Sequence, residues 1–208
     1  FFIVPSAVAL VGLGDVLVGA LFQTGAFDAS GTAYVWAVLA GYGLGLLAGT
    51  QARLYASGFY AMGDTRTPLK FAMARVALAV ALGSLAALRG PQWLGIGQEW
   101  GAVGLTLAAS VASWLEFSLL RGAMSARVGP GGLSWRLQAQ LFGAALPAGA
   151  LGLATKLALG AAVHPALRGC AVVAVFGLVY LGLASLLGVP EARSVAVRAL
   201  QRFRRGAG

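Results

Sequence analysis

The hydrophobic positions of this chain fall into long runs, with short polar segments between them. Each run is near 20 residues or longer, the length that an α-helix needs to cross the hydrocarbon of a bilayer. The runs do not alternate as the strands of a membrane barrel would, and helices satisfy their own backbone hydrogen bonds in lipid. The pattern predicts an all-α integral membrane protein with six transmembrane helices, over residues 2–22, 33–58, 69–88, 101–121, 138–160 and 166–188.

Composition supports the membrane assignment. Of the 208 residues, 59% are hydrophobic and only 10% are charged, whereas a soluble domain carries about 25% charged residues. The net charge of +9 could suggest a nucleic-acid partner. However, the basic residues lie mainly in loops and the tail, and no aromatic-rich basic motif is present, so no nucleic acid is expected as a partner.

The distribution of Lys and Arg predicts the orientation. Two of the 15 basic residues lie in 58–70, three in 121–137 and five in the tail after residue 188, against two in the opposite loops. Because positive loops stay inside, the 58–70 loop and the C-terminus are predicted to be cytoplasmic. The tail, 189–208, is expected to form a basic helix on the anionic inner leaflet or to remain a solvated segment.

The chain offers no set of catalytic or metal-binding groups. Its one histidine, His164, lies in a predicted loop, and its one cysteine is Cys170. These counts exclude a Ser-His-Asp triad within the membrane, an intrachain disulfide and a Cys/His metal cluster. We therefore predict that the protein is not an enzyme and that it uses no metal and no cofactor.

Charged residues inside the apolar runs each need a partner or an outlet to water. Arg75 and Lys156 lie near the ends of their runs and are expected to extend their charges to the interface. Glu116 is expected to pair with Arg121 or with the 58–70 loop, or to hold a coupling cation. The remaining acidic residue of the runs, Asp15, could line a water-filled cavity or mark a shallow span.

The second run carries a stripe of glycines that ends at an arginine. Gly41, Gly45 and Gly49 follow at steps of four and are predicted to let another helix pack closely. Arg53 continues the series with a drift of about 40° per step, so it is expected to face helices or a cavity. It is the candidate contact for an anionic substrate headgroup. Alternatively, Arg53 extends to the cytoplasmic surface, since about 8 Å of helix separates it from the end of the run.

Residues 58–70, GFYAMGDTRTPLK, connect the second and third runs. The glycine at 58 is predicted to end the second helix, Thr67 to cap the third, and Pro68 to take its first position. Asp64 and Arg66 can bond each other and the exposed helix ends. A well-capped turn explains these residues without a gating role, and a hinge is the functional alternative. The candidate hinge residues are Gly58, Asp64, Thr65, Arg66, Thr67 and Pro68.

This connection resembles a loop of the bacterial lipid II flippases of the MurJ (MviN) family, within the multidrug/oligosaccharidyl-lipid/polysaccharide exporter superfamily. VPSAVAL at 4–10 and LFQTGAFD at 21–28 are similar to a helix and an outer loop of that family. The glycine-rich run that leads to Arg53 also fits, and members commonly carry a basic residue there. The resemblance is carried by residues 1–75, and beyond them by helix number and loop charge.

The resemblance implies about fourteen helices, in two pseudo-symmetric lobes followed by two extra helices. Residues 1–121 would then supply four helices of the C-terminal lobe, and 122–188 the two additional helices, which shape a groove for the lipid tail. The family's best-known functional arginines would lie in early helices and at the start of the second lobe, at positions that this sequence does not include. Some members bind sodium through an acidic residue on the helix that matches 69–88. This run has no acidic residue, so sodium coupling through that site is not expected.

The function implied is that of the C-terminal part of a flippase in the bacterial cytoplasmic (inner) membrane. It would translocate lipid II, the undecaprenyl-linked peptidoglycan precursor, by alternating access. Its partners would be this lipid-linked precursor, the phospholipid bilayer and the missing N-terminal lobe. Two alternatives stay open. One is an exporter of another lipid-linked glycan or a small molecule, and the other is a non-transporting membrane scaffold that pairs through the glycine face.

Overall fold

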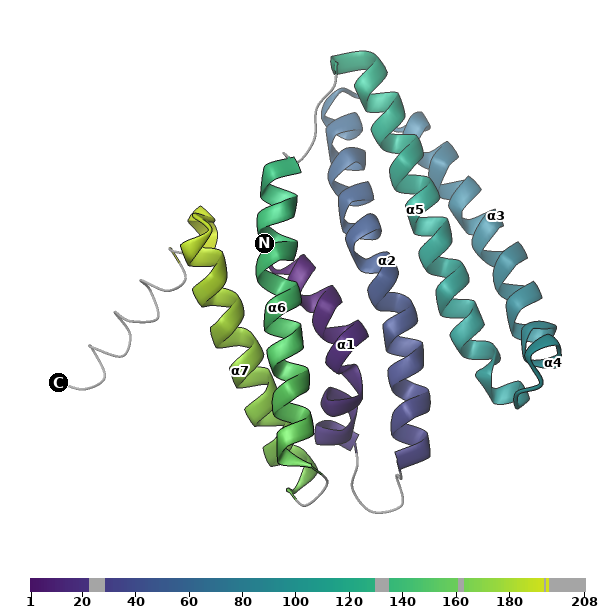
Figure 1. Cartoon of the computed structure of the whole chain (residues 1–208). Helices are drawn as coiled ribbons and strands as arrows, with labels where there is room; N and C mark the ends of the chain where they lie inside the picture. Colours follow the sequence, from purple (N-terminus) through teal and green to yellow (C-terminus); the bar gives the residue numbers. More distant parts are fainter. Residues whose placement is uncertain (23–28, 130–134, 161–162, 193, 195–208) are drawn as a thin grey trace. The chain divides into compact units, whose positions relative to one another are not determined.

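The computed structural model describes residues 1–22, 29–129, 135–160, 163–192 and 194. All the regular elements among these residues are helical, and six helices are long and apolar enough to cross a membrane. This confirms the predicted all-α architecture with six spans. The elements are α1 (Ile3–Phe22), α2 (Ala29–Ala61), α3 (Arg66–Leu88), α4 (Gly90–Leu94), the 3-10 helix η1 (Gln98–Trp100), α5 (Gly101–Val128), α6 (Trp135–Leu159) and α7 (Pro165–Leu186) (Figure 1).

Two helices are longer than the apolar runs that predicted them. Helix α2 continues to Ala61 instead of ending at Gly58, and α5 continues to Val128 instead of ending near residue 121. The 33 residues of α2 rise about 50 Å, which exceeds the roughly 30 Å of bilayer hydrocarbon. The end of α2 was predicted at Gly58 because glycine often ends a helix, whereas the helix continues through Phe59 and Tyr60 to Ala61.

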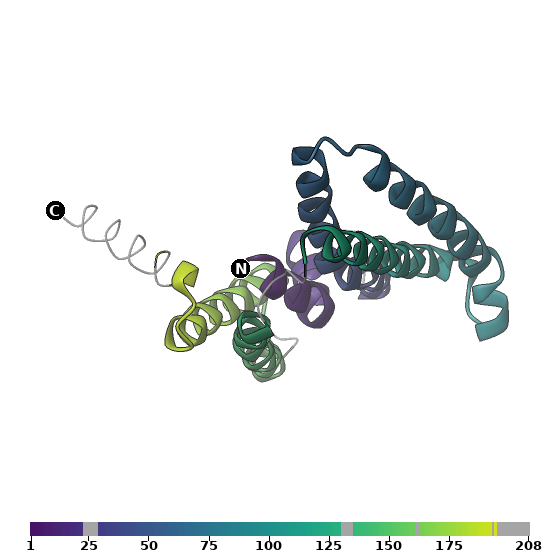
Figure 2. The ribbon, with the colours of Figure 1, turned by 90° about the horizontal axis from the view of Figure 1, so that it is seen from above.

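The described contacts divide the chain into two compact units, of which the first comprises residues 1–32 and 133–208. Within it, α1, α6 and α7 each pack against the other two (Figure 2). Small residues allow the close approach, because Ala144, Ala145 and Ala148 of α6 are fully buried. A side chain at Gly169 of α7 would collide with Ala20 of α1. This unit is therefore held by small residues at its helix contacts.

The second unit comprises residues 33–132. Helix α5 contacts both α3 and α2 in this unit. A Cβ at Gly101 of α5 would lie 2.6 Å from the carbonyl oxygen of Ala87 in α3, so only glycine permits that approach. At the other end, Ala52 and Phe59 of α2 and Leu120 of α5 form a buried cluster.

The division of the chain into 1–121, 122–188 and 189–208 stays a prediction, because contact units do not define lobes of a larger transporter. The arginines of the predicted basic tail lie outside the described residues, as do most of the residues after 192. The interfacial helix predicted there is therefore not described.

Candidate functional site

The connection between α2 and α3 is a tightly hydrogen-bonded turn. Gly63 takes a φ of 75°, which favours glycine, and its N–H donates to the carbonyl of Tyr60 at 3.0 Å. The N–H of Asp64 donates to the carbonyl of Phe59, also at 3.0 Å. This pair of bonds is a Schellman motif, which satisfies carbonyls left open at a helix end. Gly63, and not Gly58, is therefore the residue that ends α2.

The start of α3 is capped by Asp64. One carboxylate oxygen, Oδ1, accepts from the backbone N–H groups of Arg66 and Thr67, both at 3.0 Å. The other, Oδ2, accepts from the Thr67 hydroxyl at 2.7 Å. The prediction of Thr67 as N-cap and Pro68 as the first helical residue is wrong, because the stronger acceptor lies three residues earlier and the helix begins at Arg66. Pro68 still fits, since a proline is tolerated in a first turn.

A residue far along the chain completes this site. Arg127, in the last turn of α5, places Nη1 2.6 Å from Oδ2 of Asp64 and donates from Nη2 to the Thr67 hydroxyl at 3.3 Å. Its guanidinium also lies 5.2 Å from the centre of the Phe59 ring. One side chain thus joins the end of α2, the start of α3 and the end of α5. Sequence reasoning counted Arg127 only as a loop charge.

The hydrogen-bond donors around Asp64 stabilise its ionised form. The Thr67 hydroxyl and N–H, followed by the Arg127 guanidinium, hold the pKa of the Asp64 carboxyl well below its usual range. The carboxylate is therefore charged throughout the physiological pH range, and it faces Arg127 as an anion.

The glycine face of α2 contacts α5. A Cβ at Gly45 would lie 2.5 Å from the hydroxyl oxygen of Ser110, and Gly41 lies equally tightly against Thr106. The Ser110 hydroxyl donates to the carbonyl of Gly41. Gly49, by contrast, has open space where its Cβ would be.

After Gly45, the buried residues of α2 no longer follow the predicted series Gly41, Gly45, Gly49 and Arg53. The packed face continues through Ala48 and Ala52, which are 0% and 3% exposed. Steps of four and three alternate along this face because a helix has 3.6 residues per turn, so a strict step of four rotates away from the neighbour. Arg53 follows Ala52 and is exposed within its unit. It therefore does not face α5.

Arg53 differs from the other two basic residues inside the predicted spans. Among the residues that the structure describes, it makes no ion pair or hydrogen bond through its side chain. Arg75 and Lys156 each have an acidic partner. The expectation that these two extend their charges to the interface stays a prediction, and the structure adds an acidic partner to each.

Arg75 of α3 pairs with Glu116 of α5. The Arg75 Nε and Glu116 Oε2 atoms are 3.2 Å apart, although the Nε–H is not aligned for a hydrogen bond. The prediction that Glu116 pairs with a basic residue holds, but the predicted partners were wrong. Helix α3 packs beside α5 and places Arg75 next to Glu116. The prediction considered only basic residues in the adjacent loops, so it did not include Arg75.

In the first unit, Lys156 of α6 donates to Oδ2 of Asp15 in α1. The backbone carbonyl of Lys156 in turn accepts from Nη2 of Arg168, at the start of α7, at 3.3 Å. The second carboxylate oxygen of Asp15 is buried and has no hydrogen-bond partner within the described part of the chain. These contacts join three helices through groups that are 141 and 12 residues apart.

No group of three His, Cys, Asp or Glu residues that could hold a metal gathers in the ranges that the structure describes. His164 has a structural role that the sequence reading missed. Its Nδ1 accepts from the N–H of Ala166 at 3.3 Å and caps α7, directly before Pro165 at the first helical position.

Comparison with known proteins identifies the family. A family model described as "Lipid II flippase MurJ" matches residues 1–168. The chain belongs to the MurJ family. It is 36% identical to the "Probable lipid II flippase MurJ" of Rhizobium tropici over 116 residues, which are 56% of this chain and 20% of that protein. It is 35% identical to the "Lipid II flippase MurJ" of Burkholderia cenocepacia over 146 residues, which are 68% of this chain and 26% of that protein.

The matched stretches span about a fifth to a quarter of the length of these MurJ relatives. The family match includes Arg53, the 58–70 connection, Arg127 and both embedded ion pairs. The six apolar helices and MurJ membership together indicate a multi-pass protein of the inner membrane. The resemblance of residues 58–70 to MurJ loops is thereby confirmed at the level of the family.

Proposed function

We propose that this chain forms the C-terminal part of a flippase that carries lipid II across the bacterial inner membrane by alternating access. The observation that carries the proposal is the MurJ family match over residues 1–168. A flippase moves a lipid without making or breaking a covalent bond, so no residue is assigned a catalytic role. Residues 1–121 supply four helices of the C-terminal lobe, 122–188 the two additional helices, and 189–208 a basic cytoplasmic tail.

Arg53 is the cation that contacts the anionic headgroup. A charge inside a membrane span requires a partner, an outlet or a ligand. The other two embedded cations are neutralised by Glu116 and Asp15, whereas Arg53 is exposed and has no acidic partner among the described residues. The pyrophosphate of a lipid-linked precursor is an anion that an arginine binds with two parallel hydrogen bonds. The helices of the N-terminal lobe would complete the cavity around it.

The Asp64–Arg127 cluster is the cytoplasmic pivot of this movement. It joins the ends of three helices through an ion pair and two further contacts. A pivot of this kind would hold the cytoplasmic ends of the three helices together while the whole lobe rocks against the missing N-terminal lobe, as in rigid-body alternating access. The excess of basic residues in the 58–70 loop and the tail supports placing this side, and the C-terminus, in the cytoplasm.

Replacement of Arg53 tests the headgroup role. A hydrogen bond to a charged group is worth about 1.5–3 kcal/mol, so Arg53→Ala should weaken lipid II binding about tenfold or more. The protein expressed from its native gene should then fail to restore growth to flippase-depleted cells, and purified protein should bind lipid II more weakly. Arg53→Lys should restore part of both activities.

Arg121→Ala is the matched control, because Arg121 is also an exposed arginine of the second unit but lies outside the proposed site. This variant should support growth. Normal growth and normal lipid II binding with Arg53→Ala would overturn the headgroup role. Failure of the unaltered protein to support growth, despite expression, would point instead to the export of another lipid-linked glycan or a small molecule.

The scaffold alternative loses its main support. It required a free glycine face on α2, whereas Gly41 and Gly45 lie directly against Thr106 and Ser110 of the same chain. A second copy could use these glycines only if α5 moved away.

A further inference from the structure

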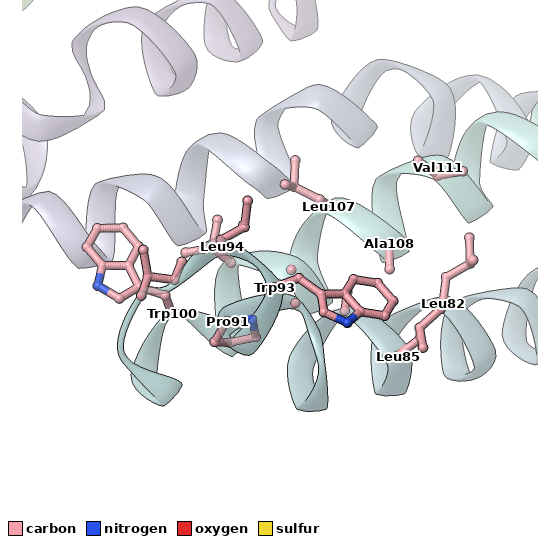
Figure 3. Close-up of a pocket in the computed structure, with 14 residues that line it drawn as sticks. Leu82, Leu85, Pro91, Trp93, Leu94, Trp100, Leu107, Ala108 and Val111 are labelled. Carbon is pink, nitrogen blue, oxygen red and sulfur yellow. The ribbon is translucent and has the colours of Figure 1, made fainter.

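The second unit contains an apolar cavity of about 460 Å³ between α3, α4 and α5 (Figure 3). All of the residues that line it have apolar or indole side chains or are glycine. They include Leu82 and Leu85 of α3, Trp93 and Leu94 of α4, and Leu107 and Val111 of α5. This cavity takes no part in the proposed transport site, since its lining lies within residues 82–111 and contains no charged residue.

The chain between α3 and α5 forms one wall of the cavity. Helix α4 is a single short turn that ends at Gly95, whose φ of 65° reverses the chain. The side-chain amide of Gln98 then donates to the carbonyl of Ala87 at 3.1 Å and ties the connection back to α3. The Trp93 side chain lies among the labelled residues of α3 and α5 in Figure 3. The cavity is therefore built by an ordered connection.

The size and lining of the cavity fit a hydrocarbon chain. The cavity opens to the surface, since Trp93 and Leu94 are 70% and 74% exposed, so in a membrane the surrounding lipid could enter it. A methylene group needs roughly the 30 Å³ of a water molecule. The cavity thus has space for roughly 15 methylene groups, of the order of one acyl chain. Trp93 and Trp100 both line it, and tryptophan is enriched at the level of lipid headgroups.

A cation lies directly beside the cavity. Arg89 is exposed and immediately precedes Gly90, a residue of the lining. Glu99 is in the same connection, but it makes no ion pair with Arg89 in the part of the chain that the structure describes. An arginine next to an apolar cavity complements a lipid with a phosphate above an acyl chain.

We propose that this cavity binds one acyl chain of an anionic phospholipid, with its phosphate at Arg89. The site goes beyond lipid II transport, because it takes a lipid of the surrounding bilayer and not the transported precursor. Neighbouring α3 exposes Val80 and Leu88, with 64% and 63% of their surfaces accessible. Helix α3 thus offers an apolar surface along which such a lipid would enter.

A filling substitution tests the acyl-chain site. The protein is expressed from its native gene and purified in detergent. It is then mixed with phosphatidylglycerol, and the number of bound lipid molecules is measured by native mass spectrometry. Val111→Trp places an indole in the cavity and should lower retention of phosphatidylglycerol at least about threefold, since affinity within a membrane comes from packing. Val76→Trp is the matched control, because Val76 is a valine of α3 outside the lining and is 53% exposed, against 54% for Val111.

A second substitution tests the headgroup contact. The unaltered protein should retain more phosphatidylglycerol than phosphatidylcholine, and Arg89→Gln should remove this preference while Glu99→Gln preserves it. Both Trp variants are first compared by thermal unfolding, and Leu107→Trp replaces Val111→Trp if the latter does not fold. Equal phosphatidylglycerol retention by the filled variant and the Val76→Trp control would overturn the proposal.

Photo-cross-linking separates a lipid from other occupants. A photoreactive residue at Leu107 should become linked to phosphatidylglycerol in vesicles of that lipid. Linkage to a distant segment of the same protein, to a second copy, or to an undecaprenyl lipid would overturn the assignment to phospholipid.

Discussion

The carboxylates of Asp64 and Asp15 both pair with a basic side chain from another helix, but their surroundings are opposite. Asp64 lies in a connection between helices, and its two oxygens accept from Arg66, Thr67 and Arg127. Asp15 lies inside a span, and only one of its oxygens is bonded, to Lys156. Its other oxygen is buried without a partner among the described residues.

The difference indicates how tightly each charge is held. A carboxylate with every oxygen bonded is fixed by several contacts, so the loss of one leaves the others in place. A carboxylate in a span depends on a single cation, because the alternative is a charge in hydrocarbon. We therefore expect the Asp64 cluster to tolerate the loss of one contact, and the first unit to be more sensitive to the loss of the Asp15–Lys156 pair.

Removing Lys156 should give the largest effect. Lys156→Met leaves the Asp15 charge without its partner and should lower the free energy of unfolding by about 3 kcal/mol. Thermal unfolding of the purified protein in detergent would measure this loss. The double variant Asp15→Asn with Lys156→Met removes both charges and should regain most of the stability. A double variant no more stable than Lys156→Met alone would contradict the dependence of Asp15 on this one cation.

Substitutions at Asp64 should give a smaller, graded effect. Asp64→Ala removes the cap of α3 and the partner of Arg127, and should lower the free energy of unfolding by less than Lys156→Met does. Asp64→Asn keeps an oxygen that accepts from the Arg66 and Thr67 amides, so its loss should be smaller. Chemical denaturation of the three proteins would rank them. If Asp64→Asn were as unstable as Asp64→Ala, the ion pair and not the cap would dominate.

Changes of pH should have the smallest effect on the Asp64 cluster. The pKa of Asp64 is lowered in the folded protein, so the stability it contributes is present above the usual aspartate pKa of about 4. That stability is lost only as the pH falls from there toward the lower folded pKa. The stability difference between the unaltered protein and Asp64→Asn should therefore be constant from pH 8 to about pH 6. A marked change within that range would show that another group titrates in the cluster.

The sequence predicted the features that depend on local pattern. Runs of apolar residues predicted six helices, and the GFYAMGDTRTPLK segment predicted a capped turn and the correct family. The choice of cap was wrong because Thr67 and Asp64 both have capping side chains, and only the observed backbone decides between them. The glycine stripe was right about a close contact at Gly41 and Gly45, but extending it by steps of four ignored the helical period.

Contacts between residues far apart in the chain could not be predicted from the sequence. Arg127 is 63 positions after Asp64, and Lys156 is 141 positions after Asp15. Each arginine or lysine has several carboxylates within reach of some plausible helix arrangement, so charge alone does not select a partner. To predict that Arg53 is exposed, one would have to know which face of α2 contacts α5.

The turn that joins α2 to α3 has a mechanical consequence. The N–H groups of Met62, Gly63 and Asp64 are bonded to carbonyls of α2, and those of Arg66 and Thr67 to the Asp64 carboxylate. The segment therefore has little torsional freedom with which to absorb a twist. A rotation of α2 about its own axis would be transmitted as torque to α3, and the two helices would turn as one stiff lever.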